Sequence, residues 1–423
     1  MVNPKIAQSF GPCQKNLYGV LLTKRCFVIG LWSILFSFSC LNSYGENRNF
    51  RLGAFNFDLA ATFQVEYNDN INGATNNPIS DVILTPGIIL VGEWKATELN
   101  TLSVSIGLGY SKYLRNPELD SSRNFLNINP DTEISFTAFV EDFTIEVFDR
   151  ITYTVDATDA LLPNNNNPID YGRFINLAGL NVDWDLNDVI LFMSFTRLDI
   201  IPTTSDFDFQ SRTEHKIEAG PRFLVAPNLT LGFTGSVAWN QWHDSGANGV
   251  IKNNSVSYSI GPMAIWQPTS VINVSASGGV IWFDFQDNDP TTPDNSNPVG
   301  FFGNIAVSHR LTQNYTHSIA FSRSYNYGYL SNFTIVDSLI YGWNWRLGKK
   351  INPRGRVGWD RGNDSGGTNP EDYDRFFVGV GMDYRFSNQI VAGLNYEWSH
   401  RNSNIFNRTF DRNRVWADLR YDF

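Results

Sequence analysis

The chain has 423 residues, of which 14% are aromatic and 17% charged, and its formal net charge is −10. Charged residues make up roughly a quarter of an ordinary soluble domain, yet the mean hydropathy of −0.23 excludes a helical membrane protein. The acidic balance argues against nucleic acid as a partner. Many aromatic residues with few charges suit strands that have one apolar and one polar face.

The first 45 residues have the composition of a leader. They contain four basic residues and no acidic one, then an apolar run of 15 residues, Cys26 to Cys40, and the small-x-small site Ser43-Tyr44-Gly45. This order predicts a signal peptide over 1–45, cleaved near Gly45. A membrane anchor is the alternative, but the run is shorter than the ~20 residues that span a bilayer.

All cysteines of the chain lie in this leader, at positions 13, 26 and 40. The exported part therefore has no disulfide framework, no thiolate metal site and no cysteine nucleophile. A lipoprotein cysteine at Cys40 is a weaker alternative, because Ser37 stands where an aliphatic residue is expected.

After the leader, apolar and polar residues alternate with a period of two. The segment 55–68, FNFDLAATFQVEYN, places Phe55, Phe57, Leu59 and Phe63 on one side and Asn56, Asp58, Gln64 and Glu66 on the other. A period of two indicates strands. The pattern predicts strands over 55–68, 82–95, 99–114, 128–140, 142–154, 173–186, 189–201, 211–225, 228–242, 253–266, 270–284, 299–312, 315–327, 333–347, 350–361, 373–386, 389–399 and 411–423.

The connections between these strands alternate between short turns and longer polar loops. No linker interrupts the alternation, so residues 46–423 are predicted to form one domain. Strands of a sandwich are usually five or six residues long, and a solenoid would show a fixed repeat. The pattern instead favours an all-β, closed antiparallel transmembrane β-barrel of about 18 strands, with 16 as the nearest alternative, long outer loops and short periplasmic turns. Closure is required because an open sheet edge in lipid leaves backbone groups unpaired.

Aromatic residues gather near the ends of the predicted strands, as expected for rings at a membrane interface. One group lies beside the short turns: Trp94, Trp184, Trp266, Trp343 and Trp345. The other lies beside the long loops: Tyr67, Tyr110, Trp239, Trp282, Tyr325, Tyr327, Trp359 and Trp398.

Two segments fit this pattern poorly. Residues 81–94 and 188–201 are apolar on both faces, and Asp149 falls on the predicted lipid side of its strand. A local bulge or a covering plug segment would explain these departures.

About 16 to 18 strands leave an aqueous channel, so the inward positions should be polar. The predicted pore-lining residues are Arg212, Glu214, Lys216, Glu218, Arg222, Arg346, Arg354, Arg356, Arg385, Arg414, Arg420, Glu133, Glu146, Asp183 and Asp185. Separate basic and acidic walls would produce a transverse field that selects ions. The alternative is a cross-strand lattice of salt bridges, and the residues alone do not decide between the two.

Catalytic and metal sites are not expected, and neither is a cofactor. The histidines show no pair at metal-ligand spacing. Ser399, His400 and Asn404 loosely resemble the catalytic set of an outer-membrane phospholipase, but their spacing is wrong and the segment falls in a predicted loop. The acid-rich run 284–294 lacks the spacing and glycine of a calcium loop, so it is interpreted as a solvated loop.

The segment VEYNDNIN, Val65 to Asn72, closes the first long strand. It resembles the tyrosine–acid–asparagine signature that opens members of the second-type outer-membrane β-barrel porin family, although Asn68 replaces the more usual acid. Members of that family often accompany exopolysaccharide loci. The resemblance implies an outer-membrane pore of a Gram-negative-type bacterium and an exit for a secreted polysaccharide, and it brings no catalytic residues.

The leading hypothesis is therefore a passive outer-membrane pore for hydrophilic solutes or a secreted polysaccharide. A structural or surface-adhesion barrel without a transport role is the second class, and an outer-membrane hydrolase the third. The chain closes on VWADLRYDF, whose apolar alternation resembles the signal recognised by the barrel-assembly machinery. The residues of this signal are Val415, Ala417, Leu419, Tyr421 and Phe423. Expected partners are outer-membrane lipid, that machinery and the solute.

Overall fold

The computed structural model describes residues 50–121, 126–155, 171–243, 252–286, 294, 296–367 and 370–423. The predicted signal peptide lies outside these residues. The strands are β1 Phe50–Leu52, β2 Phe55–Asn68, β3 Asp81–Lys95, β4 Thr101–Gly109, β5 Lys112–Tyr113, β6 Asn127–Ile128, β7 Glu133–Val140, β8 Phe143–Thr154, β9 Arg173–Asp185, β10 Val189–Pro202, β11 Arg212–Ala226, β12 Leu229–Trp242, β13 Ser255–Thr269, β14 Ile272–Phe285, β15 Val299–Arg310, β16 Tyr315–Tyr327, β17 Phe333–Trp345, β18 Ile351–Asp364, β19 Asp372–Arg385, β20 Ile390–Ser403 and β21 Phe410–Asp422. The short helices η1 Pro117–Leu119 and η3 Ser205–Gln210 lie between strands.

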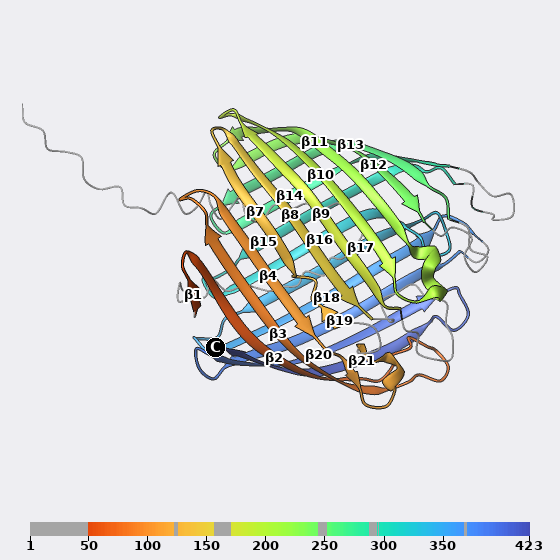
Figure 1. The fold of residues 1–423 in the computed structure, drawn as a ribbon. Coiled ribbons are helices and arrows are strands. Elements are labelled where there is room, and N and C mark those ends of the chain that lie inside the picture. The colour runs from red at the N-terminus through yellow and green to blue at the C-terminus, as the bar shows by residue number, and fades with distance from the viewer. Residues whose placement is uncertain are drawn as a thin grey trace, which may run out of the picture. The chain divides into compact units, whose positions relative to one another are not determined.

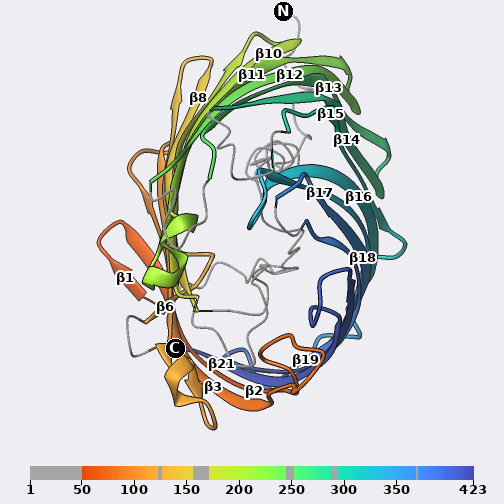
Figure 2. The same ribbon diagram turned by 90° about the vertical axis from the view of Figure 1, so that its right-hand side faces the viewer.

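The described strands form one antiparallel ring with 18 positions (Figures 1 and 2). Each position, here called a stave, is one long strand together with any short strand that continues it. The 21 strands reduce to 18 because β1 is a short hairpin arm on β2, while β5 continues β4 along β3 and β6 precedes β7 along β4. The predicted closed antiparallel barrel of about 18 strands is confirmed. Among the described residues, no helix is long and apolar enough to cross a membrane.

The ring closes between the first stave and the last. Residues Ala60 to Asn68 of β2 pair antiparallel with Arg414 to Asp422 of β21, and the Phe423 amide donates to the Leu59 carbonyl at 3.0 Å. Figure 1 shows the C-terminus beside the start of β2. The predicted seam is confirmed, and it satisfies the backbone groups that an open edge would leave unpaired.

Side chains alternate between the two faces of the wall, as a pleated strand requires. Large apolar side chains stand exposed on the outward face all around the ring, for example Ile88 (56%) on β3, Phe233 (56%) on β12 and Leu394 (57%) on β20. The inward face of these strands is polar or charged, with Glu93 on β3, Thr234 and Asn240 on β12 and Glu397 on β20. The barrel is therefore apolar outside and polar inside, the reverse of a soluble domain.

The aromatic residues of the short-turn end face outward as predicted, with Trp94, Trp184 and Trp266 all exposed. At the opposite end the prediction is wrong for Tyr325 and Tyr327. Both rings are packed inside the barrel against Phe283, because the end of β16 leaves the wall and turns inward.

Asp149 faces outward, and no bulge accounts for it. The pairing of β8 with β9 runs without a break from Phe143 to Thr154, so Asp149 keeps its place between the outward Val147 and Ile151. The segment 81–94 likewise pairs with β2 in one continuous register.

Candidate functional site: the constricted lumen

Strand alternation places nearly all the predicted pore-lining residues on the inward face. Arg212, Glu214, Lys216, Glu218 and Arg222 share this face of β11. The others on the inward face are Glu133 and Glu146 on β7 and β8, Asp183 and Asp185 on β9, Arg354 and Arg356 on β18, Arg385 on β19, and Arg414 and Arg420 on β21. Arg346 alone lies beyond its strand, exposed in the turn after β17.

The arginines of the last strands are paired with acids of the same wall. Arg354 forms a salt bridge with Asp383 and Arg356 one with Glu397. Arg414 holds Glu66 across the barrel seam at 2.8 Å, and Arg420 pairs with Asp422 at 2.7 Å. These strands therefore do not form a purely basic wall.

Several charged side chains of the earlier strands also have partners on the wall. Arg222 reaches Asp183 at 3.2 Å, and Lys216 reaches Glu218 at 2.6 Å. Glu133 pairs with Arg150, and Glu146 accepts from Asn181 at 2.9 Å. Among the described residues, the geometry thus favours the salt-bridge lattice over two walls of opposite sign.

The hairpin of β16 and β17 leaves the wall at its tip. β15 and β16 pair from Arg310 only as far as Gly303 with Arg323, so residues 324–327 pair with β17 alone. Figure 2 shows the ends of these two strands inside the ring. Gly300 permits the bend, because a Cβ atom there would lie 1.7 Å from the Tyr325 hydroxyl.

A cluster of aromatic rings holds this in-folded tip against the inward face of β14. Phe333 stacks on Phe283 and Phe285 with ring centroids 6.2 Å apart in each case. Tyr325 and Tyr327 pack on Phe283 at 6.0 and 6.3 Å. Burial of three phenylalanine rings to 7% exposure or less makes this the main apolar anchor of the tip.

Two cations cover the same tip. Lys252 is 5% exposed, and its Nζ donates to the carbonyls of Gly328 and Ser331 at 2.5 and 3.1 Å. Arg212 lies over the rings of Trp242 and Tyr327, 5.3 and 4.5 Å from their centroids. Burial, with a smaller contribution from the charge of Arg212, lowers the pKa of Lys252 to about 7.

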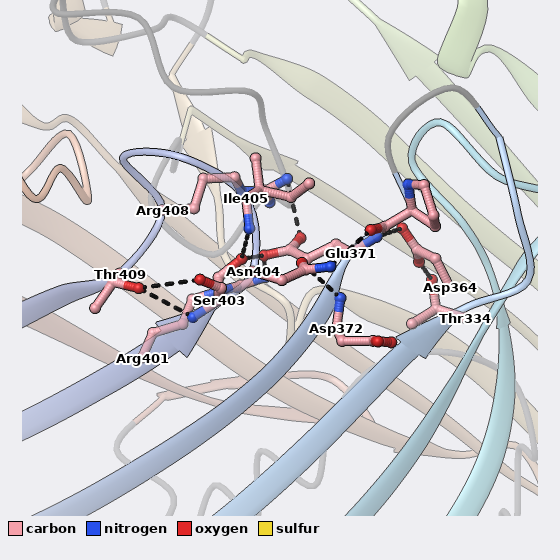
Figure 3. Close-up of polar contacts among 11 residues, drawn as sticks. Thr334, Asp364, Glu371, Asp372, Arg401, Ser403, Asn404, Ile405, Arg408 and Thr409 are labelled. Atoms are coloured by element: carbon pink, nitrogen blue, oxygen red, sulfur yellow. Dashed lines mark hydrogen bonds and ion pairs between the residues drawn. The ribbon is translucent and has the colours of Figure 1, made fainter.

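A polar chain fixes the other side of the hairpin (Figure 3). Thr334 of β17 donates to Asp364 at 2.5 Å, and Asp364 accepts from the amide of Glu371 at 3.1 Å. The Glu371 carboxylate is buried between Arg401 at 2.7 Å and Arg408 at 2.9 Å. The hairpin is therefore fastened to the strands on both of its sides.

The tip also reaches the connection between β10 and β11. Gln210 donates from Nε2 to the carbonyl of Tyr329 at 2.9 Å, and the ring of Phe209 meets that of Tyr329 edge-on at 5.3 Å. Because five staves separate β11 from β17 on the shorter side, these contacts mean that the tip narrows the lumen.

No catalytic set is assembled from the residues considered in the sequence. Ser399 and His400 are neighbours on β20, so they face opposite sides of the wall, and His400 lies in a strand rather than a loop. His400 binds Asp411 at 3.0 Å on the outward face. No group of three or more potential metal ligands occurs in the described part of the chain.

Sequence reasoning missed Asp383 and Glu397, which pair with Arg354 and Arg356, and most of the residues that fix the hairpin. Glu397 and Asp383 were detectable, because they alternate in phase with inward residues of their strands. Lys252, Glu371 and Arg408 lie in connections, where no periodicity indicates which way a side chain points.

The fold and this site together define a closed antiparallel β-barrel with a charged lumen narrowed by an in-folded hairpin. No family model matches the chain, and no curated protein matches it. Several solved structures are similar. OccK2 (OpdF) of Pseudomonas aeruginosa in complex with glucuronate is 10% identical, with 88% of this chain and 99% of that chain covered and a TM-score of 0.49.

Two further structures cover similar shares of the chain. A BenF-like porin from Pseudomonas fluorescens Pf-5 is 11% identical, with 88% of this chain and 100% of that chain covered and a TM-score of 0.48. OccAB3 of Acinetobacter baumannii is 12% identical, with 87% and 99% covered and a TM-score of 0.47. These likenesses concern the fold alone.

Proposed function

We propose that this chain is an outer-membrane channel for the passive passage of small hydrophilic solutes. The observation that carries the proposal is the division of the strands into a mainly apolar outward face and a polar inward face around a closed ring, with charged inward side chains on strands such as β11, β18, β20 and β21. A transmembrane barrel has this distribution because acyl chains cover the outside and water fills the lumen. A barrel of 18 staves is wide enough to contain water.

The in-folded hairpin favours small solutes over a secreted polysaccharide. Its tip is fastened by the aromatic cluster, by Lys252 and by Glu371, so it narrows the path that a polymer would have to follow. The lattice of paired charges around it offers hydrogen bonds to polar solutes without a strong overall preference for one sign of ion.

Liposome swelling with sugars of graded size tests this function. The full-length chain, folded into phospholipid vesicles, should admit small sugars and exclude sugars above a sharp size limit. If vesicles swell in no sugar, the channel is wrong and a structural or adhesion barrel without a transport role is left. If large oligosaccharides enter as quickly as small ones, the hairpin does not narrow the path and a polysaccharide conduit is favoured.

A further inference from the structure

The outward face of β8 to β10 carries charges in the middle of its apolar surface. Asp149 lies between Val147 and Ile151, which are 52% and 38% exposed. On β10, Arg197 and Asp199 follow the exposed Phe195 and precede Ile201, which is 52% exposed. These charges are thus bordered by apolar residues both toward the short turns and toward the opposite end.

Acyl chains are a poor environment for such a face. An outward arginine costs roughly 2–4 kcal/mol at the midplane of a bilayer. Arg197 donates from Nε and Nη2 to Asp199 at 2.9 and 3.2 Å, which offsets part of that cost. Half of the Arg197 side chain remains exposed, and its Nη1 makes no hydrogen bond among the described residues. Among the described residues, Asp149 has only the side-chain amide of Asn176 as a hydrogen-bond partner.

The positions of these charges are self-complementary. Asp149 lies opposite Ala178 of β9, and Ala178 lies opposite Arg197 of β10. Since neighbouring strands are about 4.8 Å apart, the acid and the base flank a small residue at a distance of about 10 Å. A two-fold axis that runs parallel to the barrel axis beside Ala178 exchanges the two flanks. Because the strands of a transmembrane barrel are tilted by roughly 35–45°, Asp149 and Arg197 also differ in height along the barrel axis by roughly 6 Å. Asp149 of each copy then lies on the same side of the axis as Arg197 of the other, at a height that a long arginine side chain spans, as an isologous interface requires.

We propose that the outward face of β8, β9 and β10 is the interface of a homodimer, with Ala178 beside the two-fold axis. Each Asp149 accepts from the exposed Nη1 of the opposite Arg197, while Asp199 of the same copy keeps its two bonds to that arginine. Val147, Phe195 and Ile201 surround these ion pairs and exclude water and lipid from them. The proposal rests on the membrane placement proposed above.

A single cysteine tests the interface, because residues 41–423 contain none. Ala178→Cys, expressed as the full chain in a bacterial envelope and oxidised, should give a disulfide-linked dimer of twice the chain mass. The matched control is Val378→Cys on the outward face of β19, at 38% exposure and away from the proposed axis. It should remain a monomer, since two Cα atoms must approach within about 7 Å to form a disulfide.

Charge reversal tests the ion pairs in the Ala178→Cys background. Asp149→Arg should reduce cross-linking at least fivefold, and Asp149→Arg combined with Arg197→Glu should restore it. The double variant separates a lost contact from a failure to fold, and heat-modifiable migration reports folding directly. Equal cross-linking of both cysteine variants, none at position 178, or a product with the mass of a different protein would overturn the dimer. Swelling of vesicles containing the uncross-linked variants reports the channel separately, so either proposal can fail alone.

Discussion

Arg354, Arg356, Arg414 and Arg420 of the last strands are each half of a charge pair in the lumen. Arg354 and Arg356 remain about one third exposed, yet Asp383 and Glu397 contact them directly. Arg354 also donates to Asn395 at 2.9 Å. Removal of an arginine therefore does more than subtract a positive charge, because it uncovers the carboxylate that the arginine had neutralised.

Neutralising Arg354 and Arg356 to glutamine should shift the channel toward cations. Two carboxylates then face the lumen without a counter-charge, and they attract cations at close range. The reversal potential of single channels in a salt gradient measures the shift. Arg323→Gln, on the outward face of β16, is the matched control and should change nothing.

The complementary variant tests whether ion selectivity depends on both members of each salt bridge or on the arginines alone. Asp383→Asn with Glu397→Gln should shift the reversal potential toward anions, because Arg354 and Arg356 then lack partners. Neutralising all four side chains should return it near the starting value. If all three variants leave it unchanged, these residues are too far from the ion path to affect selectivity.

At this scale, a period of two predicts which face of its own strand each side chain occupies. It succeeded for β11 and β21 because both strands stay in the wall along their whole length. It failed for Tyr325 and Tyr327, which occupy outward positions of the alternation although their rings are buried inside the barrel. The alternation assigns a side chain to one face of its own strand. It contains no information on whether that strand stays in the barrel wall.

The β16–β17 hairpin shows what is lost at the level of an element. Its strands were predicted over 315–327 and 333–347, close to the observed Tyr315–Tyr327 and Phe333–Trp345. The inward bend depends instead on β15 ceasing to pair beyond Gly303 and on rings of β14 nearly 50 residues away. Contacts between distant segments leave no local pattern in the sequence.

The docking of this tip should become stronger as the pH rises from 7 to 10. Lys252 has a pKa of about 7 when buried and an ordinary value of 10.5 when exposed. Between these values Lys252 binds more protons when the tip is undocked than when it is docked. Each rise of one pH unit therefore favours docking by up to about tenfold. Below pH 7 both forms are protonated and the effect ends. The neutral amine still donates to the two carbonyls.

Single-channel recording should therefore show fewer open events of high conductance at pH 9 than at pH 7. Arg212, Asp294 and Asp364 also face Lys252. Lys252→Met preserves the length of the side chain without a charge, and it should remove the dependence on pH. A slope that persists in Lys252→Met would assign the effect to another group.

Phe333→Ala should loosen the tip without unfolding the barrel. Truncating a buried phenylalanine costs roughly 3–5 kcal/mol, and here the loss falls on the stack with Phe283 and Phe285. We expect larger conductance and a higher size limit for sugars. Phe301→Ala, at 73% exposure on the outward face of β15, is the control and should leave both unchanged. An unaltered size limit in Phe333→Ala would show that the tip does not set it.

For the molecule as a whole, the sequence was most informative. Regular alternation over 18 segments predicted the number of staves, and the physical need to pair both edges predicted closure of β2 on β21. The two-sided apolar segment 188–201 became an ordinary stave, since Phe192 and Ile200 pack inward and Met193 and Phe195 face outward. The outward surface proposed to meet another copy could not be predicted from the sequence, because Asp149 and Arg197 come together only through the pairing of β8, β9 and β10.

Deletion of Phe423 should impair assembly of the barrel in the outer membrane. Its amide bonds to Leu59 at the seam, and its ring packs edge-on against Tyr421 with centroids 5.0 Å apart. The ring is 46% exposed on the outward face, and the prediction is that an assembly machinery recognises it there during folding. Phe423→Tyr retains both the amide and an aromatic ring, so it should assemble normally. Phe386→Ala removes a ring that is 59% exposed at another strand end and should also assemble. The amount of heat-modifiable barrel in isolated outer membranes measures the effect, and an undiminished amount in the deletion would mean that the terminal ring has no part in assembly.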